Sequence, residues 1–146
     1  MVRSLRVNFL MSSLLAETAA GHILVVDDHP DTRIILRHYL EAKGFRVREA
    51  HDGIEALAEM RASRPAAVIL DIQMPHLDGI GVLKAVRSDE VLREIPILAL
   101  SAHALSDEVQ RIKDAGADRY LAKPADPKSV LATIRELLGG KANADR

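Results

Sequence analysis

The sequence predicts a doubly wound α/β domain, in which five strand–helix units build a parallel sheet covered by helices on both faces. Strand-like and helix-like segments alternate from residue 22 to residue 140. Three of the strand-like segments, 22–27, 66–71 and 95–101, are continuous apolar runs. Such runs are typical of strands that are buried on both faces of a parallel sheet. With 146 residues, 48% of them hydrophobic, the chain can bury the core of one domain.

The other two strands are expected at the margins of the sheet. Residues 45–50 (FRVREA) alternate apolar and polar side chains, as a half-buried or edge strand does. Residues 118–123 (DRYLAK) form a short fifth strand.

Five helices are predicted between and after these strands, from apolar residues at helical spacing. They cover residues 31–44, 52–63, 78–88, 106–116 and 126–140. Asp52, Asp78 and Asp126 stand where an N-cap is expected, and Pro127 fits the first position of the last helix. Gly44 and Gly139 are expected to end the first and last helices.

Composition excludes several classes of function. Twenty basic residues nearly balance 21 acidic ones, and the formal net charge is −1, so direct nucleic-acid binding is not expected. The chain has no cysteine, which excludes disulfides, thiolate metal sites and cysteine nucleophiles. A small domain without disulfides fits a cytoplasmic location.

Three regions are expected: an N-terminal extension (1–20), a globular domain (21–140) and a polar tail (141–146). Two arginines precede a short apolar stretch in the extension, which loosely resembles a secretory signal. Polar residues interrupt that stretch, and it is too short to span a bilayer. We therefore expect a flexible extension and no membrane insertion.

Polar side chains follow four of the predicted strands, at the point where each strand ends. Asp27 and Asp28 end the first strand, Asp71 the third, Ser101 the fourth and Lys123 the fifth. In an open parallel sheet, ligands bind at the carboxyl ends of the strands, so these side chains are expected to lie together. Three carboxylates suit Mg²⁺ or Mn²⁺, while a lysine and a hydroxyl suit phosphoryl oxygens. The set is fit to hold a phosphoryl group on one carboxylate.

Each of these residues also has an ordinary structural explanation. Asp28 and Ser101 could each cap a helix, Asp71 could begin a turn, and Lys123 could be a solvated surface lysine. Their occurrence in order at the ends of four of the five predicted strands favours one functional site.

Four motifs stand at those strand ends: VVDDHP, ILDIQMPHLDG, ILALSA and GADRYLAKP. Together they resemble the receiver domain of two-component response regulators, over residues 22–139. The resemblance implies a flavodoxin-like, CheY-like fold with strand order 2-1-3-4-5.

The resemblance also implies roles for individual residues. Asp71 would be the phosphoacceptor. Asp28 and Asp71 would bind Mg²⁺ (or Mn²⁺) directly, Asp27 mainly through water, and Gln73 through its backbone carbonyl.

Further roles follow from the same resemblance. Ser101 would hydrogen-bond to the phosphoryl group, and Lys123 would pair with it across a cis peptide bond to Pro124. Ser101 and Tyr120 would form the conformational switch, with the tyrosine rotating inward. His103, together with Gln73, would tune dephosphorylation.

The predicted function is that of a single-domain response regulator. A histidine kinase or histidine phosphotransfer protein would phosphorylate Asp71, and the monomer or weak dimer would then bind a downstream protein target. Beyond its own phosphorylation and dephosphorylation it would not be an enzyme. The basic residues around the first helix, Arg33 and Arg37 among them, would help to dock the kinase.

Two alternatives stay open on the residues alone. The domain could bind its partner regardless of phosphorylation. It could also be a phosphohydrolase with an aspartate nucleophile, although such enzymes usually have an Asp-x-Asp pair and here Gln73 takes the second position.

Overall fold

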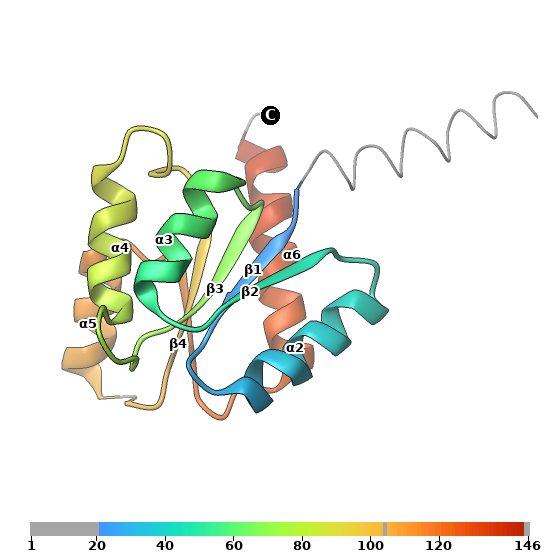
Figure 1. The fold of residues 1–146 in the computed structure, drawn as a ribbon, viewed down its shortest axis with the longest axis horizontal. Coiled ribbons are helices and arrows are strands. Elements are labelled where there is room, and N and C mark those ends of the chain that lie inside the picture. Colours follow the sequence, from blue (N-terminus) through green and yellow to red (C-terminus); the bar gives the residue numbers. More distant parts are fainter. Residues whose placement is uncertain (1–20, 104, 145–146) are drawn as a thin grey trace, which may run out of the picture.

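The computed structural model describes residues 21–103 and 105–144, which form a three-layered α/β fold (Figure 1). Five parallel strands pair in the order β2-β1-β3-β4-β5. The elements are β1 (Ile23–Val26), α2 (Pro30–Ala42), β2 (Val47–Ala50), α3 (Gly53–Ala62), β3 (Ala67–Asp71), α4 (Gly79–Ser88), β4 (Ile97–Ser101), α5 (Ser106–Ala115), β5 (Arg119–Ala122) and α6 (Pro127–Ala144). The fold class, the strand order and the sequence of elements are confirmed.

Two layers of helices bury the two faces of the sheet. The alternating side chains of β1 show the division: Leu24 and Val26 join a core cluster with residues of α3, α4 and α5. Ile23 and Val25 join a second cluster with residues of α2 and α6. Because neighbouring residues of a strand point to opposite faces, one continuous apolar run fills both clusters.

The helix starts follow the predicted capping chemistry. The carboxylate of Asp52 accepts a hydrogen bond from the Glu55 N–H at 2.7 Å, and that of Asp78 accepts one from the Gly81 N–H at 2.9 Å. Before α6, the Asp126 carboxylate accepts from the Lys128 N–H at 3.2 Å. These carboxylates satisfy backbone donors that have no partner inside the helix.

One expectation about a helix end is wrong, and one structural alternative does not hold. The N-cap of α2 is His29, without a side-chain cap bond, so the alternative that Asp28 caps this helix is excluded. The last helix does not end at Gly139 but continues to Ala144. Among the described residues, Gly44 has the left-handed backbone that ends a helix (φ +95°), and Gly139 does not. A glycine with helical dihedrals costs a helix only about 1 kcal/mol, so it weakens α6 without ending it.

The predictions for residues 1–20 lie outside the described residues. No helix in the described part of the chain has the length and apolar character needed to cross a membrane.

The amino-terminal ends of β4 and β5 are tied together by one arginine. The Arg87 guanidinium, at the end of α4, donates to the backbone carbonyls of Gly116, Arg93 and Ile95 at 2.6–2.9 Å. It also pairs with the Asp118 carboxylate at 2.9 Å, and the same carboxylate oxygen accepts the Ile97 N–H of β4 at 2.7 Å. The side chain is only 22% exposed. Arg87 therefore joins α4, the start of β4 and the turn after α5.

Replacing Arg87 with alanine should lower the free energy of unfolding by about 2–4 kcal/mol, because several backbone carbonyls lose a charged donor together. Arg61→Ala is a matched control. Arg61 lies 58% exposed and 3.7 Å from Asp89, and losing such a surface pair should cost less than about 1 kcal/mol. Urea unfolding of both variants checks the prediction, and equal losses for both would contradict it.

Candidate functional site

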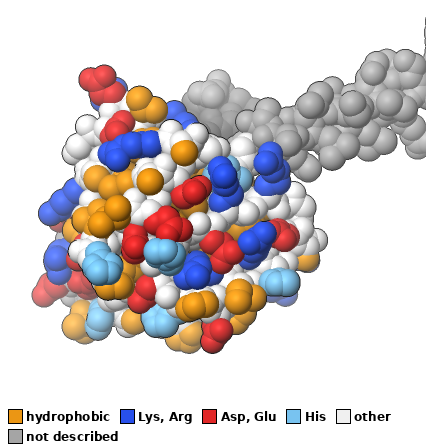
Figure 2. Space-filling model, in the orientation of Figure 1, with side chains coloured by type: hydrophobic (Ala, Val, Ile, Leu, Met, Phe, Trp, Pro, Cys, Tyr) orange, Lys and Arg blue, Asp and Glu red, His pale blue; other side chains and the backbone are white. Residues whose placement is uncertain are grey.

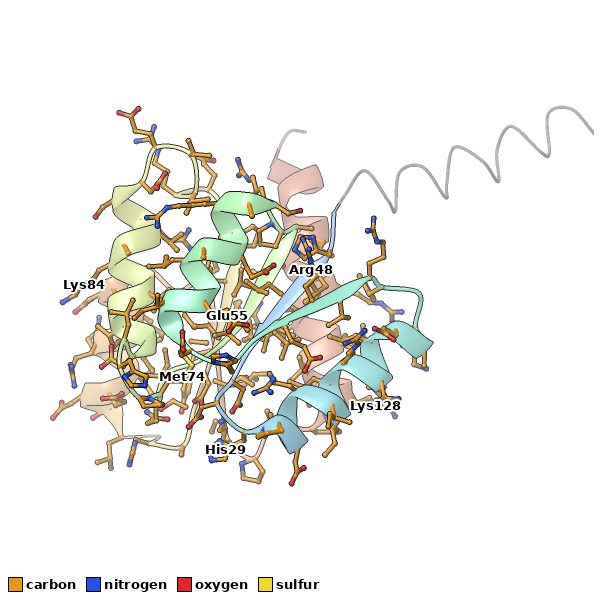
Figure 3. All side chains as sticks on the ribbon, viewed as in Figure 1. His29, Arg48, Glu55, Met74, Lys84 and Lys128 are labelled. Carbon is orange, nitrogen blue, oxygen red and sulfur yellow. The ribbon has the colours of Figure 1, made fainter. Side chains whose placement is uncertain are left out.

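The predicted residues do lie together at the carboxyl edge of the sheet. The parallel register aligns Asp71 of β3 with Leu100 of β4, and Ser101 with Ala122 of β5. In Figure 3, His29 at the start of α2 and Met74 after β3 mark this edge. Acidic side chains and histidines gather on the same part of the surface in Figure 2.

The centre of the site is a lysine between two buried carboxylates. The Lys123 Nζ lies 3.0 Å from Asp27 Oδ2 and 3.2 Å from Asp71 Oδ1. Both aspartates are only 1% exposed. Burial opposes the charged form of Lys123, but the hydrogen bond to Asp27 and the charge of Asp71 outweigh it and raise the pKa of the lysine. The peptide bond between Lys123 and Pro124 is cis, as expected.

One oxygen of Asp71 is left without a partner. Oδ1 faces Lys123 and also accepts the Gln73 N–H at 3.2 Å, whereas Oδ2 is buried and makes no hydrogen bond with any described residue. Oδ1 of Asp28 is likewise buried without a hydrogen bond. Buried oxygens in this state are costly unless a ligand satisfies them.

The residues present fit a divalent cation. Lys123 holds one oxygen each of Asp27 and Asp71, and the second oxygen of Asp27 also accepts the His29 N–H. Asp71 Oδ2 and the oxygens of Asp28 are therefore the most available for an ion. Ligand atoms of Asp27, Asp28, Asp71 and His29 all lie within 4.8 Å of one another. Hard oxygen donors of this kind suit Mg²⁺ or Mn²⁺.

Ser101 is turned toward the loop that follows β4. The buried hydroxyl accepts the Gln73 Nε2–H at 2.9 Å and the His103 N–H at 3.2 Å. The Ala102 N–H donates to Gln73 Oε1 at 3.0 Å, which fixes the orientation of the amide, and Nε2 also lies 3.5 Å from Glu108 of α5. Gln73 therefore links the loops after β3 and β4 through its side chain.

A cleft of about 460 Å³ opens beside these loops. Its lining includes Asp28, Gln73, His103 and Glu108, so the two residues expected to tune dephosphorylation share one cavity.

Tyr120 of β5 is partly buried. Its ring already packs against the cluster under α3, α4 and α5, and its hydroxyl is buried without a hydrogen bond to any described residue. The switch role of Tyr120 stays a prediction.

His29 is a further residue of the site that the sequence did not predict. Its backbone N–H donates to Asp27 Oδ1 at 2.8 Å, and its ring Nδ1 lies 3.1 Å from both Asp27 Oδ1 and Asp28 Oδ1. The only sequence signal was its position directly after the two aspartates. The arginines of α2 are engaged as well: Arg33 donates to the Asp27 carbonyl at 2.7 Å and to Glu49 at 3.2 Å, and Arg37 pairs with Glu41 and Glu49.

Burial of Asp71, together with the nearby charge of Asp27, raises its pKa from 3.8 to about 6, against the opposing effect of Lys123. The folded protein therefore binds a proton between about pH 4 and pH 6 that the unfolded chain releases. It follows that the free energy of unfolding of the metal-free protein falls as the pH rises through this range.

Asp71→Asn removes the cost of keeping a charged carboxylate buried near Asp27. At pH 7 without divalent cations, the variant should therefore be more stable than the original chain by about 1–3 kcal/mol. The difference should shrink as the pH approaches 4. Urea unfolding in a chelator at several pH values measures it, and Asp114→Asn, at an exposed position of α5, serves as the control. A destabilised Asp71→Asn protein at pH 7 would contradict the prediction.

Comparison with known proteins agrees with this geometry. Residues 23–135 match the family described as response regulator receiver domain. The polar-differentiation response regulator DivK of Brucella anthropi is 32% identical over 117 residues, which are 80% of this chain and 95% of that protein. The response regulator MprA of Mycobacterium ulcerans is 45% identical over 117 residues, but the match spans only 49% of that protein.

A solved structure gives the same result. The receiver domain of a sensor histidine kinase from Pseudomonas aeruginosa PAO1, with a magnesium ion coordinated in its active site cleft, is 32% identical. The alignment has a TM-score of 0.75 and covers 82% of this chain and 98% of that one. Motifs, fold, site and comparisons agree, and the chain belongs to the response regulator receiver domain family.

Proposed function

We propose that this chain is a cytoplasmic single-domain response regulator that accepts a phosphoryl group on Asp71 and signals through phosphorylation-dependent protein binding. The observation that carries the proposal is the state of Asp71. Its carboxylate is buried at the end of β3, one oxygen is held by Lys123, and the other has no hydrogen-bond partner within residues 21–103 and 105–144. The match to nearly the full length of DivK supports a single-domain regulator. The half-length match to MprA represents the alternative, a receiver joined to a further domain.

The transfer uses few groups. A carboxylate oxygen of Asp71 would bond to phosphorus while the bond between phosphorus and the donor's histidine nitrogen breaks, leaving an acyl phosphate and a free histidine. Lys123 stands where it can stabilise charge on the phosphoryl oxygens. Asp27, Asp28, Asp71 and the Gln73 carbonyl would hold Mg²⁺, which supplies further neutralisation of that charge.

The loop after β4 would transmit the change. The Ser101 hydroxyl is bound to Gln73 and His103, so it has to leave both partners to reach a phosphoryl oxygen. That movement would free the Gln73 amide, which also holds the Ala102 N–H and approaches Glu108 of α5. The β4–α5 loop and the start of α5 would then take a new position for a downstream protein to read.

The phosphodonor would dock beside α2. A groove of about 590 Å³ runs between α2 and the loop before α6, and its lining includes His29, Ile35, Lys123 and Pro124. Ile35 is 56% exposed, and an exposed isoleucine next to a reactive centre favours an apolar partner surface. Because His29 and Lys123 line the groove and also contact the carboxylates of the site, a protein bound in the groove would reach Asp71.

Incubation with acetyl phosphate and Mg²⁺ should add one phosphoryl group, detected by intact mass spectrometry. The adduct should require Mg²⁺, should be absent from Asp71→Asn, and should persist in Asp114→Asn. A folded protein without an adduct would favour a phosphorylation-independent binding module. Continuous release of phosphate from generic phosphomonoesters would favour the phosphohydrolase.

Ile35→Asp should slow phosphotransfer from a phosphorylated histidine phosphotransfer protein about tenfold or more, since a charge would replace an apolar contact in the groove. Labelling by acetyl phosphate, which needs no docking surface, should stay unchanged. Ile54→Asp is the matched control, because Ile54 is 64% exposed but lies on α3. Equal rates for the two variants would place the docking surface elsewhere.

A further inference from the structure

We infer that His29 is an additional metal ligand, which makes this site favour first-row transition ions such as Mn²⁺ over Mg²⁺. The inference rests on the proposed function, because it concerns the cation that would assist phosphorylation of Asp71. It adds a nitrogen donor to a site whose other donors are oxygens.

The first reason is the placement of the ring nitrogen. His29 Nδ1 lies 3.1 Å from Asp27 Oδ1 and 3.1 Å from Asp28 Oδ1. Two ligands about 2.1 Å from one ion in adjacent octahedral positions are about 3.0 Å apart. The nitrogen and the two oxygens are therefore already spaced like neighbouring ligands of a single ion.

The second reason is that Lys123 does not occupy the carboxylate oxygens that an ion would need. Lys123 takes Asp27 Oδ2 and Asp71 Oδ1, which are not the oxygens near the imidazole or the unpaired one. Asp71, 1% exposed, keeps an oxygen, Oδ2, that makes no hydrogen bond with any described residue. This buried oxygen is an observation independent of the histidine, and it indicates a missing cation.

The third reason is the local backbone, which holds the histidine in place. The His29 N–H donates to Asp27 Oδ1 at 2.8 Å, and Pro30 follows as the first residue of α2 (His29 is labelled in Figure 3). A proline there fixes φ and favours an extended residue before it, and His29 has that conformation (φ −92°, ψ 115°). The imidazole is 68% exposed, so it can bind an ion with its proton on Nε2 and its Nδ1 lone pair toward the carboxylates.

The chemical consequence is selectivity. Imidazole suits Zn²⁺, Fe²⁺ and Ni²⁺ best, and among the two ions that suit the oxygen donors here, the transition ion Mn²⁺ accepts a nitrogen ligand more readily than Mg²⁺ does. Removing His29 should therefore weaken Mn²⁺ binding about tenfold and leave Mg²⁺ binding within about twofold.

The test is metal titration of the full chain without any phosphodonor, by calorimetry with Mn²⁺ and with Mg²⁺. Pulsed electron paramagnetic resonance of the Mn²⁺ complex should show coupling to a directly bound nitrogen, and His29→Ala should lose both that coupling and the added Mn²⁺ affinity. Circular dichroism establishes that the variant is folded. His51→Ala is the matched control, because His51 lies 3.2 Å from Asp52 in the other histidine–carboxylate group of the described residues.

The outcomes separate the inference from the proposed function. Unchanged nitrogen coupling in His29→Ala, or its loss in His51→Ala instead, would overturn the role of His29 while leaving a carboxylate Mg²⁺ site intact. Failure of the original chain to bind either ion would overturn the proposed Mg²⁺-dependent phosphorylation as well.

Discussion

The structure of the site depends on one electrostatic constraint: two buried carboxylates share one ammonium group. Asp27 and Asp71 come from neighbouring strands, and without Lys123 their charges would face each other in a medium that solvates them poorly. Because one ammonium group contacts only one oxygen of each aspartate, the negative charge of the two carboxylates is only partly neutralised. The remaining oxygens belong to the part of the site where an added cation and a phosphoryl group would lie.

The sequence predicts the fold well because both of its main signals are local. Continuous apolar runs such as 66–71 identify strands that have helices on both faces, and Asp52, Asp78 and Asp126 mark helix starts. The sequence also predicts that Asp27, Asp71 and Lys123 meet, since the topology of a parallel sheet decides which strand ends meet.

What could not be predicted is how side chains are oriented once they meet. The Gln73 amide could have faced solvent, and only the Ala102 N–H, 29 residues away in the sequence, explains why Nε2 faces Ser101. The role of His29 could not be predicted either, because its contact with two carboxylates depends on the turn between β1 and α2. The continuation of α6 beyond Gly139 was missed because a glycine indicates a helix end only when its φ is positive.

The Arg87 network has a mechanical consequence for the opposite edge of the sheet. It fixes the beginning of β4 through Ile97 and Asp118, and it fixes the end of α5 through the Gly116 carbonyl. Ser101, at the other end of β4, is held by the neutral Gln73 amide and the His103 N–H. The start of α5 is held through the contact of the same amide with Glu108. If Ser101 moves, the start of α5 can move with it while the end of α5 stays fixed at Gly116. Under the proposed function, α5 would pivot about its end at Gly116, while its start would move beside the proposed phosphorylation site.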